Sequence, residues 1–433
     1  MKKVLIITYY WPPSGGAGVQ RSLKFVKYLP AFGIEPIVIT VDANQATYPI
    51  VDETLEKEID PSIRVIRTRS FEPLKILSAL KGKDNIPHGG FANTNKESIT
   101  QKTLRFVRGN FFIPDARRGW VRFAVKAASE LIEKEKIDTV FVSSPPHSSQ
   151  LIGMELKEKY KVRWIADMRD PWTDIYYYKD LLQTKFAASR DAVYERQVLE
   201  GADEVISVSE PINEMFLSKS TKLKREKFHI IPNGYDSDDF INAGKSQLDF
   251  FQVTYVGTMA DIYRPAILFE AFQRLVKEFS VEKNDIRLTM VGSSASAIKQ
   301  IMEASGVDKI AEFVPHVDHS AAIEYMQKAD VLLLVIPDVE NSEGILTGKL
   351  FEYLGTGKPI VGLGPKGGKA SAIIEECEAG KLFERNQAEE LYLYLKELFL
   401  MKQSGKVFKN KAEAVENYSR KNLTSKLASL MKS

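Results

Sequence analysis

Cysteine is almost absent from this chain, and long apolar runs are missing altogether. Cys377 is the only cysteine in 433 residues, which excludes a disulfide framework and a zinc or iron–sulfur site built from cysteines. This usage is typical of a reducing compartment, so we expect a cytoplasmic location. No stretch approaches 18 consecutive apolar residues, so the sequence predicts no membrane-spanning helix.

An excess of one charge is also missing. Lys and Arg total 60 against 57 for Asp and Glu, which leaves a formal net charge of +3. A nucleic-acid binder needs a concentrated basic face, so this balance argues against nucleic-acid partners. Hydrophobic residues make up 44% and charged residues 27%, as in soluble globular proteins. A chain of this length exceeds one ordinary core, so we expect two domains.

Short apolar runs rich in Val and Ile are present, in two series. Each run precedes a turn and then a segment of 3.6-residue periodicity, which predicts parallel strands covered by helices on both faces. The fold class is therefore α/β, with a doubly wound parallel sheet in each half. The predicted strands are 4–8, 36–41, 65–68, 139–142, 163–166, 204–208, 252–256, 286–291, 311–314, 331–336 and 359–362.

The restart of this pattern predicts the domain boundaries. We expect an N-terminal domain at 1–210, a C-terminal domain at 211–410 and a final helix over 411–433. Residues 44–118 fit the alternation poorly, because Pro, Gly, Asn and charges are mixed with isolated aromatics. They are expected to form an irregular insertion of the kind that often serves as a binding loop.

Turns rich in small residues follow several predicted strands, where ligands of open parallel sheets bind. Such turns, when they lead into a helix, present backbone amides to an anion. Their spacing is not G-x-G-x-x-G, so a nicotinamide cofactor is disfavoured. Arg264 adds a cation near one turn, with a solvated surface charge as the alternative reading. The turn residues are Gly15, Gly16, Gly18, Gly257, Thr258 and Gly292.

The most informative segment is 344–364, where Lys349 opens a predicted helix and Glu352 follows one turn later. A cation at a helix N-terminus is electrostatically unfavourable unless an anion binds there as well. We therefore expect Lys349 and the helix amides to bind phosphates, while Glu352 accepts ribose hydroxyls. An ion pair between these two side chains is the simpler alternative. It leaves the surrounding glycines unexplained.

Several motifs together resemble the retaining, nucleotide-sugar-dependent glycosyltransferases of family 4. The resemblance covers both halves in the right order and implies the GT-B architecture, with two Rossmann-like domains facing across a cleft. It also implies that the donor binds mainly to the C-terminal domain and that the final helix crosses back to the N-terminal one. The motifs are GGAGVQR at 15–21, DMRDPW at 167–172, IPNGYD at 231–236, VGTM at 256–259 and GKLFEYLGTGKPIV at 348–361.

The resemblance also assigns residues to the donor. Glu352 matches the second Glu of the family's E-x7-E motif, which binds the donor ribose. The first Glu would fall at position 344, which is glycine. Sugar recognition is therefore expected from Glu343 or from the backbone around Leu346, Thr347 and Gly348.

Catalytic roles follow in the same way. His147 comes directly after a predicted strand, where family members often place a histidine that contacts the donor sugar. The usual Gly-Arg pair is Gly257-Thr258 here, so Arg264 and Lys349 are the expected diphosphate ligands. Cations and amides aimed at the leaving diphosphate stabilise the transition state by a few kcal/mol per contact, on the order of 3. We therefore expect no metal, and no cofactor beyond the nucleotide-sugar substrate.

The acceptor side is less constrained. The resemblance implies a glycan or lipid-linked glycan acceptor in cell-surface polysaccharide synthesis. Arg169, Asp170 and Trp120 are its candidate contacts, although Arg169 and Asp170 could instead brace their loop. Aromatics and cations in the insertion could rest on anionic lipid at the inner membrane face, and an ordinary solvated surface explains them equally well.

Two other functions remain open at this point. A nucleotide-sugar epimerase on the same scaffold would need carboxylates on facing strand ends, and no convincing pair is found. A non-catalytic nucleotide-sugar-binding protein is consistent with the missing Glu at position 344.

Overall fold

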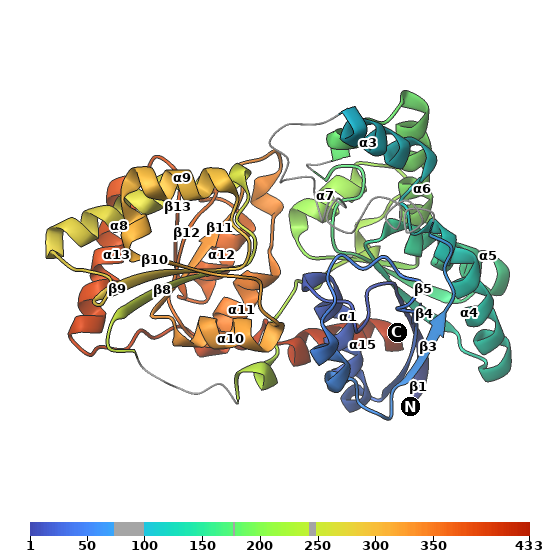
Figure 1. The fold of residues 1–433 in the computed structure, drawn as a ribbon. Coiled ribbons are helices and arrows are strands. Elements are labelled where there is room, and N and C mark those ends of the chain that lie inside the picture. The colour runs from blue at the N-terminus through green and yellow to red at the C-terminus, as the bar shows by residue number, and fades with distance from the viewer. Residues whose placement is uncertain (73–98, 176–177, 242–247) are drawn as a thin grey trace. The chain divides into compact units, whose positions relative to one another are not determined.

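The computed structural model describes residues 1–72, 99–175, 178–241 and 248–433 (Figure 1). The chain divides into two compact units. The first contains Met1–Pro232 and Leu423–Ser433, and the second contains Asn233–Asn422. Among the described residues, no helix combines the length and the apolar character needed to cross a bilayer.

The first unit is built on a seven-stranded parallel sheet with the order β3-β2-β1-β4-β5-β6-β7. Its central strands are buried on both faces, which is why they read as continuous apolar runs. The strands are β1 (Lys2–Thr8), β2 (Ile34–Val41), β3 (Arg64–Thr68), β4 (Thr139–Ser144), β5 (Arg163–Met168), β6 (Glu204–Ser207) and β7 (Phe228–Ile230).

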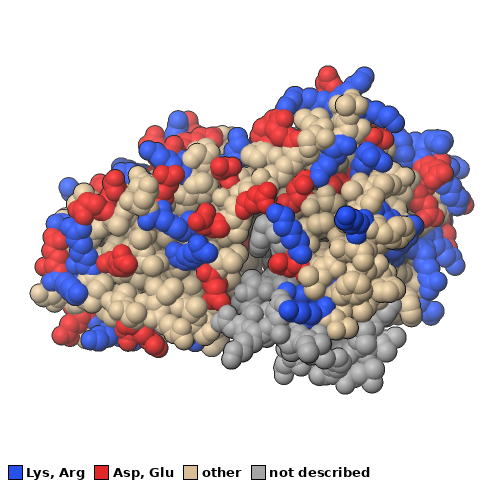
Figure 2. Space-filling view, turned by 90° about the horizontal axis from the view of Figure 1, so that it is seen from above, with Lys and Arg blue, Asp and Glu red and all other residues tan. Residues whose placement is uncertain are grey.

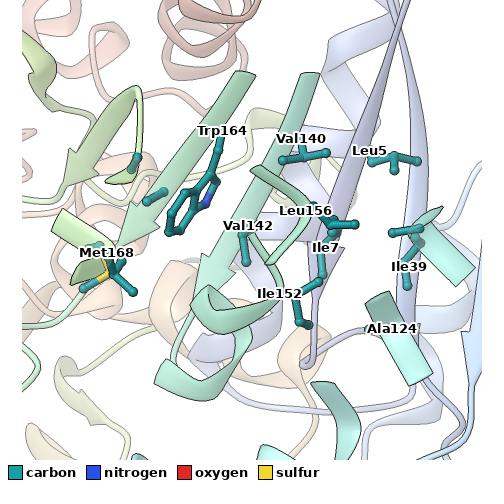
Figure 3. Close-up of a cluster of buried hydrophobic side chains, with 14 of the residues drawn as sticks. Leu5, Ile7, Ile39, Ala124, Val140, Val142, Ile152, Leu156, Trp164 and Met168 are labelled. Carbon is teal, nitrogen blue, oxygen red and sulfur yellow. The ribbon is translucent and has the colours of Figure 1, made fainter. Parts of the chain in front are cut away.

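Helices cover both faces of this sheet. One face packs on α4 to α7 through a core that includes Ile7, Val142 and Trp164 (Figure 3). The other packs on α1 and on the returning helix α15, whose Leu423 and Leu427 are fully buried. The helices are α1 (Ala17–Tyr28), α3 (Ile99–Phe111), α4 (Val121–Glu135), α5 (Gln150–Tyr160), α6 (Lys185–Gly201), α7 (Glu210–Leu217) and α15 (Arg420–Lys432).

The second unit repeats the plan with a six-stranded parallel sheet of order β10-β9-β8-β11-β12-β13. Helices α8, α9 and α13 cover one face, and α10, α11, α12 and α14 cover the other. Its strands are β8 (Phe251–Val256), β9 (Ile286–Val291), β10 (Ala311–Val314), β11 (Val331–Val335), β12 (Ile360–Leu363) and β13 (Gly380–Phe383). Its helices are α8 (Ala266–Phe279), α9 (Ser296–Ser305), α10 (His319–Lys328), α11 (Gly348–Thr356), α12 (Lys369–Glu376), α13 (Ala388–Gln403) and α14 (Ala412–Glu416).

The α/β prediction and the eleven predicted strands are confirmed to within a few residues at their ends. Three boundary expectations differ. The first unit extends past the predicted residue 210 to Pro232, because β7 pairs with β6. The predicted 411–433 helix is two helices with a break at 417–419, and only Leu423–Ser433 joins the first unit. Within the predicted insertion 44–118, β3 is regular because it pairs with β2; residues 73–98 lie outside the described residues.

Both sheets reverse their order beside their first strand, between β1 and β4 in one and between β8 and β11 in the other. Loops that follow these strands diverge to opposite faces and leave room at the carboxyl edge of the sheet. Candidate ligand residues are therefore sought at these two edges.

Candidate functional site

Two glycine turns lie side by side at the carboxyl ends of β8 and β9 in the second unit. Gly257 has φ +118° and Gly292 has φ +111°, a region that favours glycine. A Cβ on Gly292 would lie 2.6 Å from the carbonyl oxygen of Gly257. A Cβ on Gly257 would lie 2.9 Å from Nζ of Lys349, which comes from α11. The predicted turns and the predicted lysine are thus brought together.

Lys349 has a neutral partner. Its ammonium donates to the hydroxyl of Tyr255 at 2.8 Å and lies 4.3 Å from the centre of that ring. Burial lowers the pKa of Lys349. In the described part of the chain no carboxylate lies within 4.0 Å of it. A partly buried cation at the start of a helix, with no carboxylate bound to it, is suited to receive an anion.

The start of α11 supplies further donors. Thr347 is extended (φ −79°, ψ 148°) and does not cap the helix, and its buried hydroxyl has no hydrogen-bond partner. Gly348 begins the helix, and Leu346 before it packs in the core. Glu343 is exposed in the 3-10 turn Ser342–Gly344. The amides and the unused hydroxyl therefore lie at the helix start, next to Lys349.

Glu352 pairs with His319, which the sequence analysis does not name as a site residue. Its Oε1 lies 3.1 Å from Nε2 of His319, and the two side chains are 24% and 18% exposed. The alternative ion pair with Lys349 is not formed. His319 begins α10 in the loop that follows β10, so the strand-end rule that singled out His147 would have found it too.

Arg264 stands apart from this cluster. It ends the 3-10 turn Asp261–Tyr263 in the left-handed region (φ +44°), and its side chain is exposed. In the described residues no hydrogen bond or ion pair joins Arg264 to Lys349 or Gly257. Thr258 is exposed, and its carbonyl accepts from the Tyr255 hydroxyl at 2.8 Å.

At the equivalent edge of the first unit the charged groups satisfy one another. Arg21 donates to both carboxylate oxygens of Asp167 at 2.8–3.1 Å and to the carbonyl of Pro232 at 2.9 Å. Both side chains of the pair are 0% exposed. Ser143 donates to the same carboxylate at 2.7 Å. The charges of Arg21 and Asp167 are therefore compensated within the protein.

Arg169 likewise braces the loops. Its guanidinium donates to the carbonyls of Ser144 at 2.9 Å, Pro145 at 3.3 Å and Gly18 at 2.7 Å. It therefore ties together the loops that follow β1, β4 and β5. Asp170 beside it is partly buried, and burial raises its pKa.

His147 is held from one side by an aromatic ring. It stacks on Trp172 with ring centres 4.7 Å apart and an interplanar angle of 11°. Trp172 is fixed in turn by Asp191, which accepts from its indole at 2.9 Å and from Tyr178 at 2.7 Å. Burial lowers the pKa of His147 to about 4, so the imidazole is neutral at pH 7. Its buried Nδ1 has no hydrogen-bond partner.

The first glycine turn is explained largely by packing. A Cβ on Gly15 would lie 2.9 Å from Ile50, and Gly16, before α1, has φ +82°. Gly18 presents its carbonyl to Arg169. These contacts need no ligand.

The predicted role of Trp120 is wrong. We expected an acceptor contact, but its side chain is 0% exposed, donates to the hydroxyl of Thr68 at 2.8 Å and packs on Tyr9. A residue enclosed in this core cannot touch an acceptor.

No group of three or more His, Cys, Asp or Glu side chains able to hold a metal ion is found within residues 1–72, 99–175, 178–241 and 248–433.

Two family models match consecutive parts of the chain. The model described as "Glycosyltransferase Family 4" matches residues 86–239, and "Glycosyl transferases group 1" matches residues 236–421. No curated protein sequence matches the chain.

Solved structures with the same arrangement of elements span the whole chain. Sucrose-phosphate synthase from Thermosynechococcus elongatus is 16% identical, with a TM-score of 0.63 over 100% of this chain and 98% of that one. The Anabaena protein HepE, solved in complex with UDP-glucose, is 14% identical with a TM-score of 0.61 over 100% of both chains. WaaG, a glycosyltransferase involved in lipopolysaccharide biosynthesis, is 14% identical with a TM-score of 0.54 over 99% of both chains.

At these identities the structural likeness shows the fold alone, which is GT-B. The two family models add the class of enzyme. The chain therefore belongs to the GT-B glycosyltransferases of the family 4 type.

Proposed function

We propose that this glycosyltransferase moves a sugar, with retention of the anomeric configuration, from a nucleotide sugar to a glycan or lipid-linked glycan in cell-surface polysaccharide synthesis. The observation that carries the donor assignment is Lys349, a partly buried cation with a neutral partner at the start of a helix. We place the reaction in the cytoplasm, at the inner face of the membrane.

The nucleoside diphosphate is the group that this site fits. Lys349 and the first amides of α11 hold the diphosphate oxygens, and the free hydroxyl of Thr347 donates to one of them. The two glycine turns let those oxygens approach the backbone. Glu352 accepts the ribose hydroxyls while His319 stays bonded to its Oε1 and orients the carboxylate. We also propose that Glu343 and Leu346 contact the donor sugar and that Arg264 contacts the diphosphate.

The reaction then follows from charge. The bond between the anomeric carbon and the diphosphate oxygen breaks, and negative charge develops on the leaving group. Lys349 and the amides are already aimed at that charge, which lowers the barrier without reorganisation. The acceptor oxygen attacks from the same face and passes its proton to the departing diphosphate. We assign neutral His147 to a hydroxyl of the transferred sugar. No step requires a metal ion.

Two of the similar structures support this choice of substrates. One carries UDP-glucose, and another is a glycosyltransferase of lipopolysaccharide biosynthesis. Both substrates are proposals for this chain.

The test compares donor use by the wild type with two site variants. Lys349→Ala and Glu352→Ala are each expected to lower donor-dependent turnover tenfold or more, about 1.4 kcal/mol of transition-state stabilisation. The donor is first identified by a thermal-shift screen of nucleotide sugars, because a bound ligand raises apparent stability. Diphosphate release is then measured with and without EDTA.

Lys381→Ala is the matched control, because Lys381 also lies over a tyrosine ring, 4.6 Å from the centre of Tyr394, but outside the proposed site. It should retain wild-type turnover. Normal turnover in both site variants would refute the assignment. An epimerised nucleotide sugar without diphosphate release would identify an epimerase, and donor binding without release to any acceptor would identify a binding protein.

A further inference from the structure

The DMRDPW motif at 167–172 ends in a tryptophan whose ring is enclosed by the protein. Trp172 is 2% exposed, which is too little for a substrate to reach it. Its indole covers one face of the His147 imidazole, with ring centres 4.7 Å apart and an interplanar angle of 11°. Stacked aromatic rings hold each other in a defined plane. Any effect of Trp172 on the reaction therefore passes through His147.

The stack is the contact that orients the His147 ring. A functional histidine is usually oriented by a hydrogen bond from one ring nitrogen to a carboxylate or a backbone carbonyl. Among the residues that the structure describes, neither ring nitrogen of His147 has such a bond, and its Nδ1 is buried. The flat face of the indole takes the place of that bond, so removal of the indole would leave the imidazole free to rotate.

The backbone is fixed on both sides of His147. Before it, the carbonyl of Ser144 accepts from the guanidinium of Arg169, which belongs to the same motif as the stacked tryptophan, at 2.9 Å. After it, the carboxylate of Asp115 accepts from the amide and from the hydroxyl of Ser148, both at 2.8 Å. The Cα of His147 is thus held by its neighbours, and the rotation of its side chain is the freedom that the stack removes.

Two carboxylates on α6 hold the segment that carries Trp172. Asp191 accepts from the indole at 2.9 Å and from the hydroxyl of Tyr178 at 2.7 Å. One turn later, Glu195 accepts from the hydroxyl of Thr173 at 2.5 Å. Figure 2 shows Lys, Arg, Asp and Glu side chains intermingled on the surface of the protein, where water solvates them. The two carboxylates of α6 are instead 1% and 0% exposed, and their hydrogen bonds are directed at one loop.

The burial of these carboxylates is unfavourable for the folded state. Burial raises the pKa of Asp191 to about 6 and also raises the pKa of Glu195. Lys219 lies 3.5 Å from Glu195, but in the described part of the chain no cation lies within 4.0 Å of Asp191. Buried polar networks of this kind make a segment rigid. Natural proteins tolerate such unfavourable features mainly at functional sites, where geometry matters more than stability.

We infer that Trp172 is a positioning residue for His147 and that Asp191 holds Trp172 in place for this role. The inference rests on the proposed function, in which His147 contacts a hydroxyl of the transferred sugar. The stack keeps the imidazole in one plane, so that a ring nitrogen meets the hydroxyl without first losing rotational freedom. Loss of the stack should lower kcat more than it raises the donor KM, because the diphosphate of the donor is assigned to Lys349 and α11.

A double-mutant cycle in the full chain tests the inference. Trp172→Leu, which removes the aromatic ring, should lower kcat about tenfold. The same substitution in a His147→Gln background should have no further effect, because Trp172 acts through His147. Trp172→Phe keeps a ring that can stack and should recover most of kcat. Asp191→Ala should lower kcat several-fold, whereas Asp191→Asn, which keeps an oxygen that accepts from the indole, should recover most of it.

The matched control is Trp164→Leu, because Trp164 is a second fully buried tryptophan of the same core and among the described residues its ring does not stack on His147. It should lower Tm as Trp172→Leu does and keep the kcat of the wild type. Thermal melts check that every variant is folded. If Trp172→Leu does not fold, the cycle is run with Asp191→Ala, whose effect should likewise vanish in the His147→Gln background.

Proton NMR reports the position of the imidazole independently of activity. The ring protons of His147, assigned by their absence in His147→Gln, should be shifted by the indole ring current in the wild type. This shift should disappear in Trp172→Leu and persist in Asp191→Asn.

The outcomes separate this inference from the proposed function. Three results would overturn the inference and leave the proposed function standing: normal kcat in Trp172→Leu, an equal loss of kcat with and without His147, or an equal loss in Trp164→Leu. A wild type that transfers no sugar to any acceptor would instead refute the proposed function, and the inference with it.

Discussion

The two sheet edges use their cations in opposite ways. In the first unit, Arg21 is bonded to a carboxylate and a carbonyl, and Arg169 to three carbonyls. In the second unit, Lys349 contacts a neutral hydroxyl and a ring, and the described residues place no hydrogen-bond partner at the Thr347 hydroxyl near it. Both edges occupy the same place in a doubly wound sheet. They differ in whether a carboxylate or carbonyl of the protein compensates the cation.

The bonding of a cation therefore distinguishes a structural charge from a functional one better than its place at the sheet edge does. A buried cation whose bonds are all made within the protein stabilises the fold. Its removal leaves the buried partner charge uncompensated, which destabilises the folded state. A cation without an ionised partner bears the cost of desolvation in the folded state and is compensated when an anion binds. The comparison therefore predicts opposite outcomes for matched substitutions at the two edges.

The largest expected effect is at the first edge. Arg21→Met should destabilise the protein by about 3–5 kcal/mol, because it leaves the fully buried Asp167 with no cation. Urea denaturation followed by circular dichroism measures the loss. Arg196→Met, which removes an exposed arginine from α6, is the control and should change stability by less than about 0.5 kcal/mol. A similar small change in Arg21→Met would mean that the pair does not support the fold.

The acid stability of the first unit should depend on His147. Its pKa is lowered from 6.5 to about 4, so the folded state holds the imidazole neutral. Above pH 6.5 the imidazole is neutral in both the folded and the unfolded state. As the pH falls from 6.5 towards 4, the proton binds to the unfolded state first, so the free energy of unfolding decreases. The loss is on the order of 2–3 kcal/mol, since each pH unit corresponds to about 1.4 kcal/mol. His147→Gln should remove this loss, which is measured as unfolding free energy between pH 7.5 and 4.

Asp191 acts in the opposite direction over part of that range. Burial raises its pKa to about 6, so its unfavourable ionisation is relieved as the pH falls. The wild-type profile therefore contains both effects, and only the difference between wild type and variant isolates His147. Substitution of the exposed His316 by Gln should leave the profile unchanged. Parallel profiles for wild type and His147→Gln would contradict the assignment.

Much of the fold was predictable because each sheet is buried on both faces. Strands such as Val331–Val335 have continuous apolar sequences. The two strands that were not predicted, Phe228–Ile230 and Gly380–Phe383, are short edge strands that contain a polar residue. Missing the first of them placed the domain boundary too early.

The site was predictable in its positions but not in its pairings. The place of Lys349 at a helix start follows from local sequence, and the structure puts it against the predicted glycine turn. Its bond to Tyr255 and the bond of Glu352 to His319 join residues far apart in the chain, which no periodicity reveals. Trp120 shows the converse error. An aromatic residue among cations suggested a surface, but tertiary packing encloses it.

A smaller effect is expected at His319. His319→Ala should raise the donor KM about fivefold with little change in kcat, because one charge-assisted hydrogen bond that orients Glu352 is lost. Steady-state kinetics with saturating acceptor measures both constants. His319→Gln should restore much of the affinity, since its amide can donate to the same carboxylate. An unchanged KM in the alanine variant would show that His319 does not position Glu352.

The smallest expected change is in the stability of Lys349→Met, and it is the most direct test of the contrast. Methionine fills similar space, and the Tyr255 hydroxyl keeps its bond to the carbonyl of Thr258. The lost hydrogen bond and cation–π contact are offset by removal of a desolvated charge, so unfolding free energy should change by less than about 1 kcal/mol. Stabilisation by a nucleoside diphosphate, measured as a shift in Tm, should nevertheless disappear. A loss as large as that of Arg21→Met would place Lys349 among the charges that hold the fold, and the second edge would then be as self-contained as the first.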